Sequence, residues 1–214
     1  MKKILTFVLF FMITCISVFA FDIIQTRPSL NQTTSFGLYQ VGNDVTVYEK
    51  PDENSNILYR IRWNKEEFFP EDINYDKFFV VYISSKDLAL VNVMDYEDEW
   101  LEIVYNNQTN KTGWIKMDDP YKFMTWVNFY NAYGKKYGLV QLKGAPDLVN
   151  DIKASPDEKS KTLAVINHAQ KINLNVIKGN WALVSVMDLD KTPKTGYIRW
   201  RSDDGVRYYF PAMK

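Results

Sequence analysis

The chain has 214 residues, of which 26 are basic and 26 are acidic, and aromatic residues make up 15% of it. This balance of charge gives no electrostatic case for nucleic acid or an anionic membrane surface as a partner. The length suits one or two domains, and the abundant aromatic side chains favour compact β-rich modules.

The first twenty residues have the pattern of a secretory signal. Lys2 and Lys3 precede an unbroken apolar stretch at 4–13, and the small residue Ala20 stands at the expected cleavage point. We therefore expect residues 1–20 to be removed and the protein to be exported, to the periplasm or out of the cell. Without Lys2 and Lys3, 24 basic residues face 26 acidic ones, a net charge of −2. A bilayer span needs about 20 apolar residues, so we expect no transmembrane segment in the mature chain.

From residue 37 onward the sequence repeats itself. Five blocks of the first half return in the same order in the second half: Gly37–Val41 as Gly138–Leu142, Lys50–Ser55 as Ser155–Ser160, Val91–Val93 as Leu174–Val176, Trp100–Val104 as Trp181–Ser185, and Lys111–Lys116 as Lys194–Arg199. Five matches in one order indicate two copies of one structural unit.

The first copy spans about residues 37–118 and contains an insertion at about residues 61–90. Aromatic residues are frequent in it: Trp63, Phe68, Phe69, Tyr75, Phe78 and Phe79. Loops beyond about 12–15 residues are commonly functional or disordered, and this one is too aromatic for a solvated tail. We expect it to pack back on its own unit, with Phe78–Ile83 as an additional strand.

Residues 119–137 connect the two copies. Asp119 as N-cap, Pro120 at the first helical position and Gly134 as a stop predict one helix from Pro120 to Tyr133. Apolar side chains would cover most of its faces, which predicts burial between the two copies. The alternative is a strand with alternating residues at Phe123, Thr125, Val127 and Phe129.

The second copy spans about residues 138–204 and shows strand periodicity most clearly. Apolar and polar residues alternate from Ile172 to Val176, as in a half-buried strand. Lys178–Asn180 predicts a tight turn in which Gly179 takes a positive φ, and Trp181–Met187 predicts the returning strand. A closing strand is expected at Gly196–Trp200, and residues 205–214 form a C-terminal strand or tail.

At these positions the sequence resembles the bacterial SH3 domains, in which a Pro/Ser-rich loop precedes paired hydrophobic strands, a Trp-x-x-Val stretch and a closing Gly-aromatic-Ile/Val. The residues that carry the resemblance are Pro51, Ser55, Trp100, Ile103 and Gly113–Ile115 in the first copy, and Pro156, Ser160, Trp181, Val184 and Gly196–Ile198 in the second. The resemblance implies a mainly β fold of two tandem small SH3-like β-barrels joined by the aromatic-rich helical connector. It also implies recognition of peptidoglycan stem peptides, wall polymer or a protein peptide through grooves of the barrels.

The sequence lacks residues that several classes of enzyme require. Cys15, the only cysteine, lies within the expected signal, and His168 is the only histidine. These counts exclude a Cys-His pair, a Ser-His-Asp triad and a His-rich zinc site. Acidic clusters remain at Asp95–Glu99 and Asp118–Asp119, and a solvated hairpin turn before Trp100 explains the first of them. We expect no catalytic residue, no metal site and no cofactor.

Aromatic residues are the candidates for ligand contact. Trp100, Trp114, Trp181 and Tyr197 occupy equivalent positions, so we expect them to fill the cores, with a ligand shelf as the competing use. Better candidates lack a counterpart in the other copy: Trp63, Phe68, Phe69, Tyr75, Trp200, Tyr208, Tyr209 and Phe210. Exposed aromatic patches mark interfaces, although packing of the insertion and of the C-terminal strand is the competing explanation.

The leading hypothesis is a non-enzymatic exported binding protein of the cell envelope, whose partner is a cell-wall polymer or peptide. The alternative is a structural or assembly protein that binds another envelope protein, for which one contiguous apolar patch at the insertion or at Tyr208–Phe210 would be the sign. A carboxylate-based hydrolase ranks last, because it needs two facing carboxylates about 5–10 Å apart.

Overall fold

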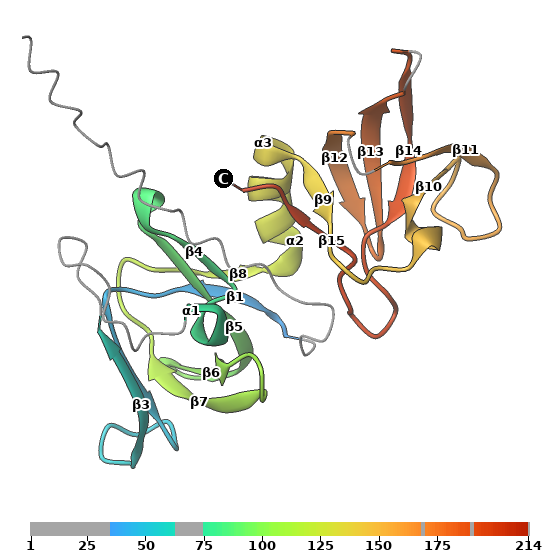
Figure 1. The fold of residues 1–214 in the computed structure, drawn as a ribbon. Helices are drawn as coiled ribbons and strands as arrows, with labels where there is room; N and C mark the ends of the chain where they lie inside the picture. The colour runs from blue at the N-terminus through green and yellow to red at the C-terminus, as the bar shows by residue number, and fades with distance from the viewer. Residues whose placement is uncertain (1–34, 63–74, 168–169, 189–190, 214) are drawn as a thin grey trace, which may run out of the picture.

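The computed structural model of the protein describes residues 35–62, 75–167, 170–188 and 191–213. These residues form two antiparallel β-sheets with a helical segment between them (Figure 1). The mainly β fold agrees with the expectation, and the closure of each sheet into an SH3-like barrel stays a prediction. The expected signal at 1–20 and residue His168 lie outside the described residues. None of the described helices is long and apolar enough to cross a membrane.

The first sheet contains the strands of the first repeat. Its strands are β1 (Gly37–Gln40), β2 (Asp44–Tyr48), β3 (Ile57–Arg62), β4 (Val81–Ile83), β5 (Leu88–Glu97), β6 (Trp100–Asn106), β7 (Lys111–Lys116) and β8 (Phe123–Thr125). They are ordered β3-β2-β7-β6-β5-β1-β8, and β4 pairs with β5. Two short helical turns, α1 (Tyr75–Phe78) and η1 (Ser84–Lys86), flank β4.

The second sheet repeats this arrangement. Its strands are β9 (Leu139–Gln141), β10 (Asp151–Lys153), β11 (Thr162–Val165), β12 (Ile172–Lys178), β13 (Trp181–Met187), β14 (Pro193–Arg199) and β15 (Tyr209–Pro211), and η3 (Asp147–Asn150) precedes β10. Their order, β11-β10-β14-β13-β12-β9-β15, matches the first sheet strand for strand once β4 is set aside. The repeat in the sequence is therefore also a repeat of topology.

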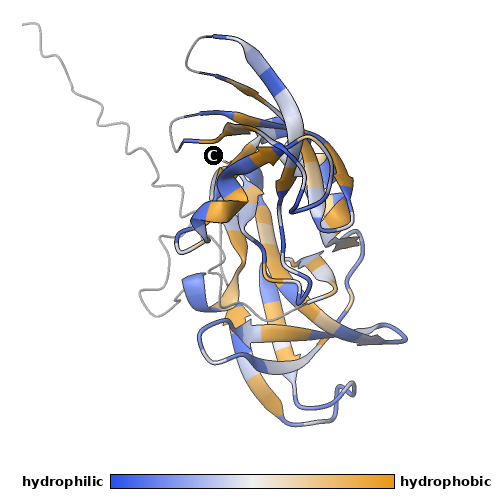
Figure 2. Ribbon diagram, turned by 90° about the vertical axis from the view of Figure 1, so that its right-hand side faces the viewer, coloured by the Kyte–Doolittle hydropathy of each residue, from blue (hydrophilic) through white to orange (hydrophobic). Residues whose placement is uncertain are grey.

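The predicted hairpin of the second copy is present. Lys178 pairs with Trp181 across the turn, and Gly179 has a φ of 56°. Ile172 and Leu174 are buried as their spacing predicts, but Val176 is exposed because the register shifts after Leu174. Figure 2 shows hydrophobic and hydrophilic residues alternating along strands of both sheets, which is the pattern that buries one face of a strand.

The connector is strand first and helix second. The helical run consists of α2 (Trp126–Phe129), η2 (Tyr130–Gly134) and α3 (Lys135–Tyr137), so the expected start at Pro120 is wrong. Thr125 is the N-cap, because its Oγ1 accepts a hydrogen bond from the Asn128 N–H at 3.2 Å. The run continues past Gly134 and ends at Gly138, whose φ of 83° suits only glycine well.

Tertiary contacts explain why this helix begins at Trp126 and not at Pro120. The Tyr39 hydroxyl donates to the Asp118 carbonyl at 3.0 Å and accepts from the Asp118 N–H at 2.7 Å, which holds the chain at the sheet. Phe123–Thr125 then pairs with β1 as β8. The strand and helix interpretations of the connector thus each hold for part of it.

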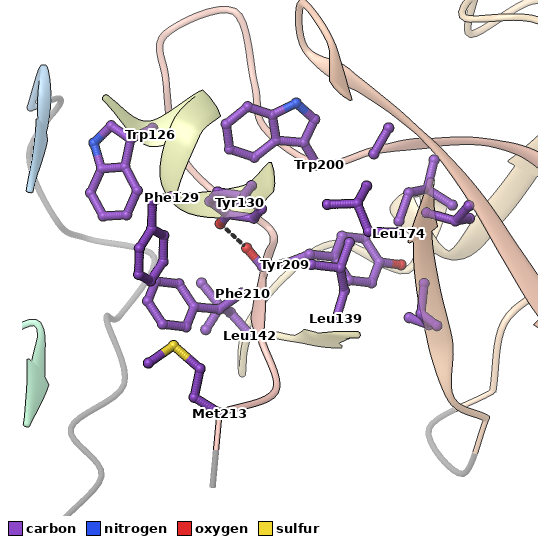
Figure 3. Close-up of a cluster of buried hydrophobic side chains, with 14 of the residues drawn as sticks. Trp126, Phe129, Tyr130, Leu139, Leu142, Leu174, Trp200, Tyr209, Phe210 and Met213 are labelled. Carbon is purple, nitrogen blue, oxygen red and sulfur yellow. Dashed lines mark hydrogen bonds between the residues drawn. The ribbon is translucent and has the colours of Figure 1, made fainter. Parts of the chain in front are cut away.

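The helical run lies at the centre of the larger hydrophobic core. Trp126, Phe129 and Tyr130 pack between residues of β1, β4 and β5 on one side and residues of the second sheet on the other. Figure 3 shows these side chains together with Trp200, Tyr209 and Phe210, and the Tyr130 hydroxyl donates to the Tyr209 carbonyl. The two repeats therefore share one core through the connector.

Residues 75–90, the described part of the insertion beyond β3, pack on the first sheet, as expected. Tyr75, Phe78, Phe79 and Tyr82 are buried in the smaller core, with the Tyr75 and Tyr82 ring centroids 4.6 Å apart. The additional strand is present as β4, shorter than expected because residues up to Phe78 form α1. Burial raises the pKa of Tyr75 to about 12.

Two equivalent glycines allow close packing beside the closing strands. A Cβ on Gly196 would lie 2.6 Å from Ile152 Cγ2 and 2.6 Å from the Lys153 carbonyl oxygen, and Gly113 is similarly crowded by Val47. We expect Gly196→Ala to lower the free energy of unfolding by about 1–3 kcal/mol, because overpacking forces the backbone apart. Urea titration followed by circular dichroism measures this, with Lys194→Ala in the same strand as control. A loss below about 0.5 kcal/mol, the usual range of surface changes, would contradict it.

Candidate functional site

A turn of the same geometry follows β2 in the first repeat and β10 in the second. We call these turns, Lys50–Ser55 and Ser155–Ser160, the acidic turns. In each, the last serine accepts from the N–H of the first residue, at 3.1 and 3.0 Å, and the aspartate accepts from the N–H two residues on, at 2.9 Å. Such local side-chain bonds define the turn, so Glu53 and Glu158 are held at equivalent places.

Each acidic turn forms an ion pair with the end of the closing strand. Lys116 Nζ lies 2.7 Å from Glu53 Oε1 in the first repeat, and Arg199 Nη1 lies 2.6 Å from Glu158 Oε1 in the second. The hydrogen bond to Glu53 raises the pKa of Lys116. Exposed ion pairs contribute only about 0–1 kcal/mol to stability, so stability alone is a weak reason for this arrangement to occur twice.

Each ion pair borders a surface pocket. The first-repeat pocket, of about 270 Å³, is lined by Tyr39, Val41, Gly42, Asp44, Val45, Thr46, Tyr48, Glu53, Ile115, Lys116, Met117 and Asp118. The second-repeat pocket, of about 260 Å³, is lined by Pro146, Leu148, Val149, Asp151, Lys153, Glu158, Trp181, Arg199 and Tyr208. The first pocket lies between β2, its acidic turn and the basic end of the closing strand β7. The second lies between β10, its acidic turn and the basic end of the closing strand β14.

The second-repeat pocket combines an aromatic ring with both signs of charge. The Arg199 guanidinium lies 5.5 Å from the centroid of the Trp181 ring, within the range of a cation–π interaction. Lys153 Nζ is 2.9 Å from Asp151 Oδ2, and this hydrogen bond is the main cause that lowers the pKa of Asp151. Such a pocket suits a peptide that carries charged and apolar groups side by side.

The first-repeat pocket is more acidic. Tyr48 stands where the second repeat has Lys153, since each pairs with the aromatic residue of its closing strand. The Tyr48 ring packs edge-on against Trp100, with ring centroids 5.5 Å apart. Three carboxylates and the single base Lys116 are among the described residues that line the pocket, so it presents several acceptors for a cationic group and, in Lys116, one partner for a carboxylate.

The structure separates the aromatic residues that were predicted to contact a ligand. Trp200 is 0% exposed and Tyr75 is 6% exposed, and Tyr209 and Phe210 are also buried, so packing, the competing explanation, accounts for these four rather than an exposed ligand surface. They fill the cores instead. Tyr208 is half-buried and lines the second-repeat pocket. The remaining candidates lie outside the described residues and stay predictions: Trp63, Phe68 and Phe69.

The aromatic residues at equivalent positions of the two repeats are more exposed than predicted. Trp100 is buried, but Trp114, Trp181 and Tyr197 are only half-buried, so the expectation that all four fill the cores is wrong for three of them. Strand alternation explains Trp114 and Tyr197, because the glycine before each and the isoleucine after each face the core.

Sequence reasoning missed the charged residues of both pockets. Glu53 and Glu158 stand in matched blocks, as do Lys116 and Arg199, and the charge is kept in both copies. An acidic residue and a basic residue that both recur at matched positions are the sequence signal that could have predicted these pockets.

The first acidic cluster, Asp95–Glu99, lies at a hairpin turn. Asp95–Glu97 ends β5, and Asp98, with a φ of 49°, begins the turn into β6, as the hairpin interpretation predicts. Among the described residues, no group of three His, Cys, Asp or Glu side chains could hold a metal ion.

Comparison with known proteins places the chain in no family. No protein-family model matches it, and no curated protein matches it. Among solved structures, that of NlpC2 from Trichomonas vaginalis is similar over 82% of this chain and 49% of that chain, with 12% sequence identity and a TM-score of 0.27. The chain thus spans about half the length of that protein.

Proposed function

We propose that the protein is an exported, non-enzymatic binding protein of the cell envelope. In this proposal the two sheets are SH3-like barrels, and the two pockets beside the acidic turns bind peptide segments of the cell wall. One observation carries the proposal: the same ion pair beside the same turn borders a pocket of similar size in each repeat.

The chemistry of the pockets supports a peptide rather than an uncharged sugar as the ligand. A carboxylate of the peptide can replace Glu158 or Asp203, whose oxygens lie 2.6 and 2.7 Å from Arg199 Nη1 and Nη2, because a guanidinium matches a carboxylate in a bidentate geometry. Asp151 and Glu158 can accept from an ammonium group, and Trp181 and Tyr208 offer apolar surface for the chain between such groups. Wall peptides present both signs of charge at short spacing.

Co-sedimentation with intact peptidoglycan sacculi tests the proposal. We expect the purified protein to pellet saturably, and Arg199→Gln to weaken pelleting about tenfold, because a charge-assisted hydrogen bond contributes about 1.5–3 kcal/mol. Lys194→Gln is the matched control, since it removes one charge from the same strand outside the pocket. Circular dichroism verifies that both variants are folded.

Either of two results would contradict this proposal. Absence of pelleting by the wild-type protein at any concentration would exclude direct wall binding. Equal pelleting of Arg199→Gln and wild type would exclude the second-repeat pocket as the site. The first result would favour the second candidate function, an assembly role with another envelope protein, which cross-linking in the envelope would then examine.

An apolar groove supports that second candidate. Its volume is about 540 Å³, and Phe36 and Tyr96 in its wall are 65% and 73% exposed. Val93, Asp95, Leu101, Met117, Phe123 and Thr125 complete it. The patch lies neither at the insertion nor at Tyr208–Phe210, where an assembly role had predicted it. Exposed apolar patches of this kind mark protein interfaces.

A further inference from the structure

A pocket between the two repeats contains a buried charge without a partner. The pocket, of about 240 Å³, is lined by Ser35, Trp126, Trp200, Arg201, Asp203, Asp204, Gly205 and Arg207. Arg207 is only 5% exposed, and its Nε has no hydrogen-bond acceptor in the part of the chain that the structure describes. Burying a charge is costly unless it is paired and hydrogen-bonded, so this guanidinium requires an explanation.

Interactions within the protein compensate the Arg207 charge only in part. Its guanidinium lies 3.8 Å from the centroid of the Trp126 ring, a cation–π contact. The pKa of Arg207 is lowered to about 10, mainly by burial, which Tyr130 opposes and the positive charge of Arg201 reinforces. The side chain therefore keeps its charge at neutral pH while lacking the in-plane acceptors that a guanidinium needs.

The second arginine of the pocket also lacks a carboxylate partner. Arg201 Nε donates to Asn180 Oδ1 at 2.6 Å, and its guanidinium lies 4.9 Å from the Trp200 ring. Over the described ranges of the chain, neither Arg201 nor Arg207 has a carboxylate oxygen within ion-pair distance. Two cations thus line one small pocket, and neither forms an ion pair with Asp203 or Asp204, which line it as well.

The acidic residues of the pocket limit which anion fits. Asp203 is held by Arg199 Nη2 at 2.7 Å and by Asn180 Nδ2 at 2.8 Å, so its carboxylate is already used. Asp203 and Asp204 add negative charge to the lining, which disfavours a phosphate dianion more than a singly charged carboxylate. The volume is below the roughly 300–1,000 Å³ of drug-sized sites, so it accommodates one small group.

We infer that the pocket between the repeats binds the carboxylate group of a small or peptide ligand, with Arg207 as its bidentate partner. Arg201 adds a second positive charge, and the Ser35 hydroxyl and the two tryptophan rings complete the walls. Arginine suits this role better than lysine because two parallel N–H groups of its planar guanidinium can donate to both carboxylate oxygens. This inference does not depend on the proposed wall binding, since it concerns a different pocket.

Ligand-induced stabilisation tests the inference on the purified protein. N-acetylglycine is the probe, and N-acetylglycinamide, which differs only in lacking the carboxylate, is the reference compound. At a probe concentration a hundred times the dissociation constant we expect the thermal midpoint to rise by about 5 °C or more, saturably and at constant ionic strength. Tryptophan fluorescence supplies a second readout, because Trp126 and Trp200 line the pocket.

Variants of the arginine make the test specific. Arg207→Met should abolish the response without lowering stability, because replacing an unpaired buried charge by an apolar side chain of similar size is often neutral or stabilising. Arg207→Lys keeps the positive charge but lacks the two parallel N–H donors of a guanidinium. We therefore expect this variant to fold normally and to bind the probe at least tenfold more weakly. Arg60→Gln, an exposed arginine outside the pocket, should retain the full response.

Three outcomes would overturn the inference. A midpoint that moves equally with N-acetylglycine and its amide would show that the carboxylate is not recognised. An undiminished response of Arg207→Met or Arg207→Lys would exclude Arg207 as the partner. A response to inorganic phosphate alone would overturn the assignment to a carboxylate.

Discussion

Replacing Trp200 by alanine is expected to lower the free energy of unfolding by about 3–5 kcal/mol, the range found when a buried large aromatic is truncated. The Trp200 ring is 0% exposed, and its centroid lies 4.4 Å from that of Tyr130 in the connector. Its Nε1 also donates to the Gly179 carbonyl at 2.9 Å, which ties the β12–β13 turn to the core. Native domains are stable by only about 5–15 kcal/mol, so this loss is a large fraction of the total.

Urea unfolding followed by circular dichroism measures the effect, with Trp181→Ala as the matched control. Trp181 is half-buried at the second-repeat pocket, so its removal should cost less than half as much. Equal losses for the two tryptophans would contradict the central place of Trp200 in the shared core. Trp200→Ala is consequently a stability variant and is unsuitable for testing ligand contact.

The second large effect is expected when both pockets lose the basic residue at the end of the closing strand, Lys116 in the first repeat and Arg199 in the second. If the pockets bind one polymer together, Lys116→Gln with Arg199→Gln should lower the apparent affinity for sacculi by about 10²-fold or more. Each single variant keeps one intact pocket, whereas the double variant loses both the contacts and the gain from simultaneous binding, which can reach about 10²–10⁴.

The control for this double variant is Lys111→Gln with Lys194→Gln. These lysines occupy matched positions at the other ends of the same closing strands and line neither pocket, so the net charge changes equally. Pelleting of the control should equal that of the wild type. A double variant no weaker than the more affected single variant would show that the two pockets do not act together.

Much of the local structure could be predicted from the sequence. The hairpin of β12 and β13, the turn at Gly179 and the additional strand β4 lie where periodicity and turn residues indicated. These features depend on short-range rules, since strand alternation and a positive φ are properties of a few adjacent residues. The same strand order in both sheets follows from the matched blocks.

The start of the connecting helix could not be predicted in this way. Asp119 and Pro120 form a good helix start by local rules, but pairing of β8 with β1 and the bonds between Tyr39 and Asp118 override them. Propensity is a weak signal whenever tertiary contacts compete with it.

The sequence by itself determined that two similar β units follow one another, with an aromatic connector between them. Only the tertiary structure decided which aromatic side chains are buried, because burial depends on how the connector packs against both sheets. It buried Trp200 and left Trp181 half-exposed beside Arg199. It also brought Arg201 and Arg207 into one pocket with Trp126, residues that a linear pattern cannot place together because the interaction depends on distance in space.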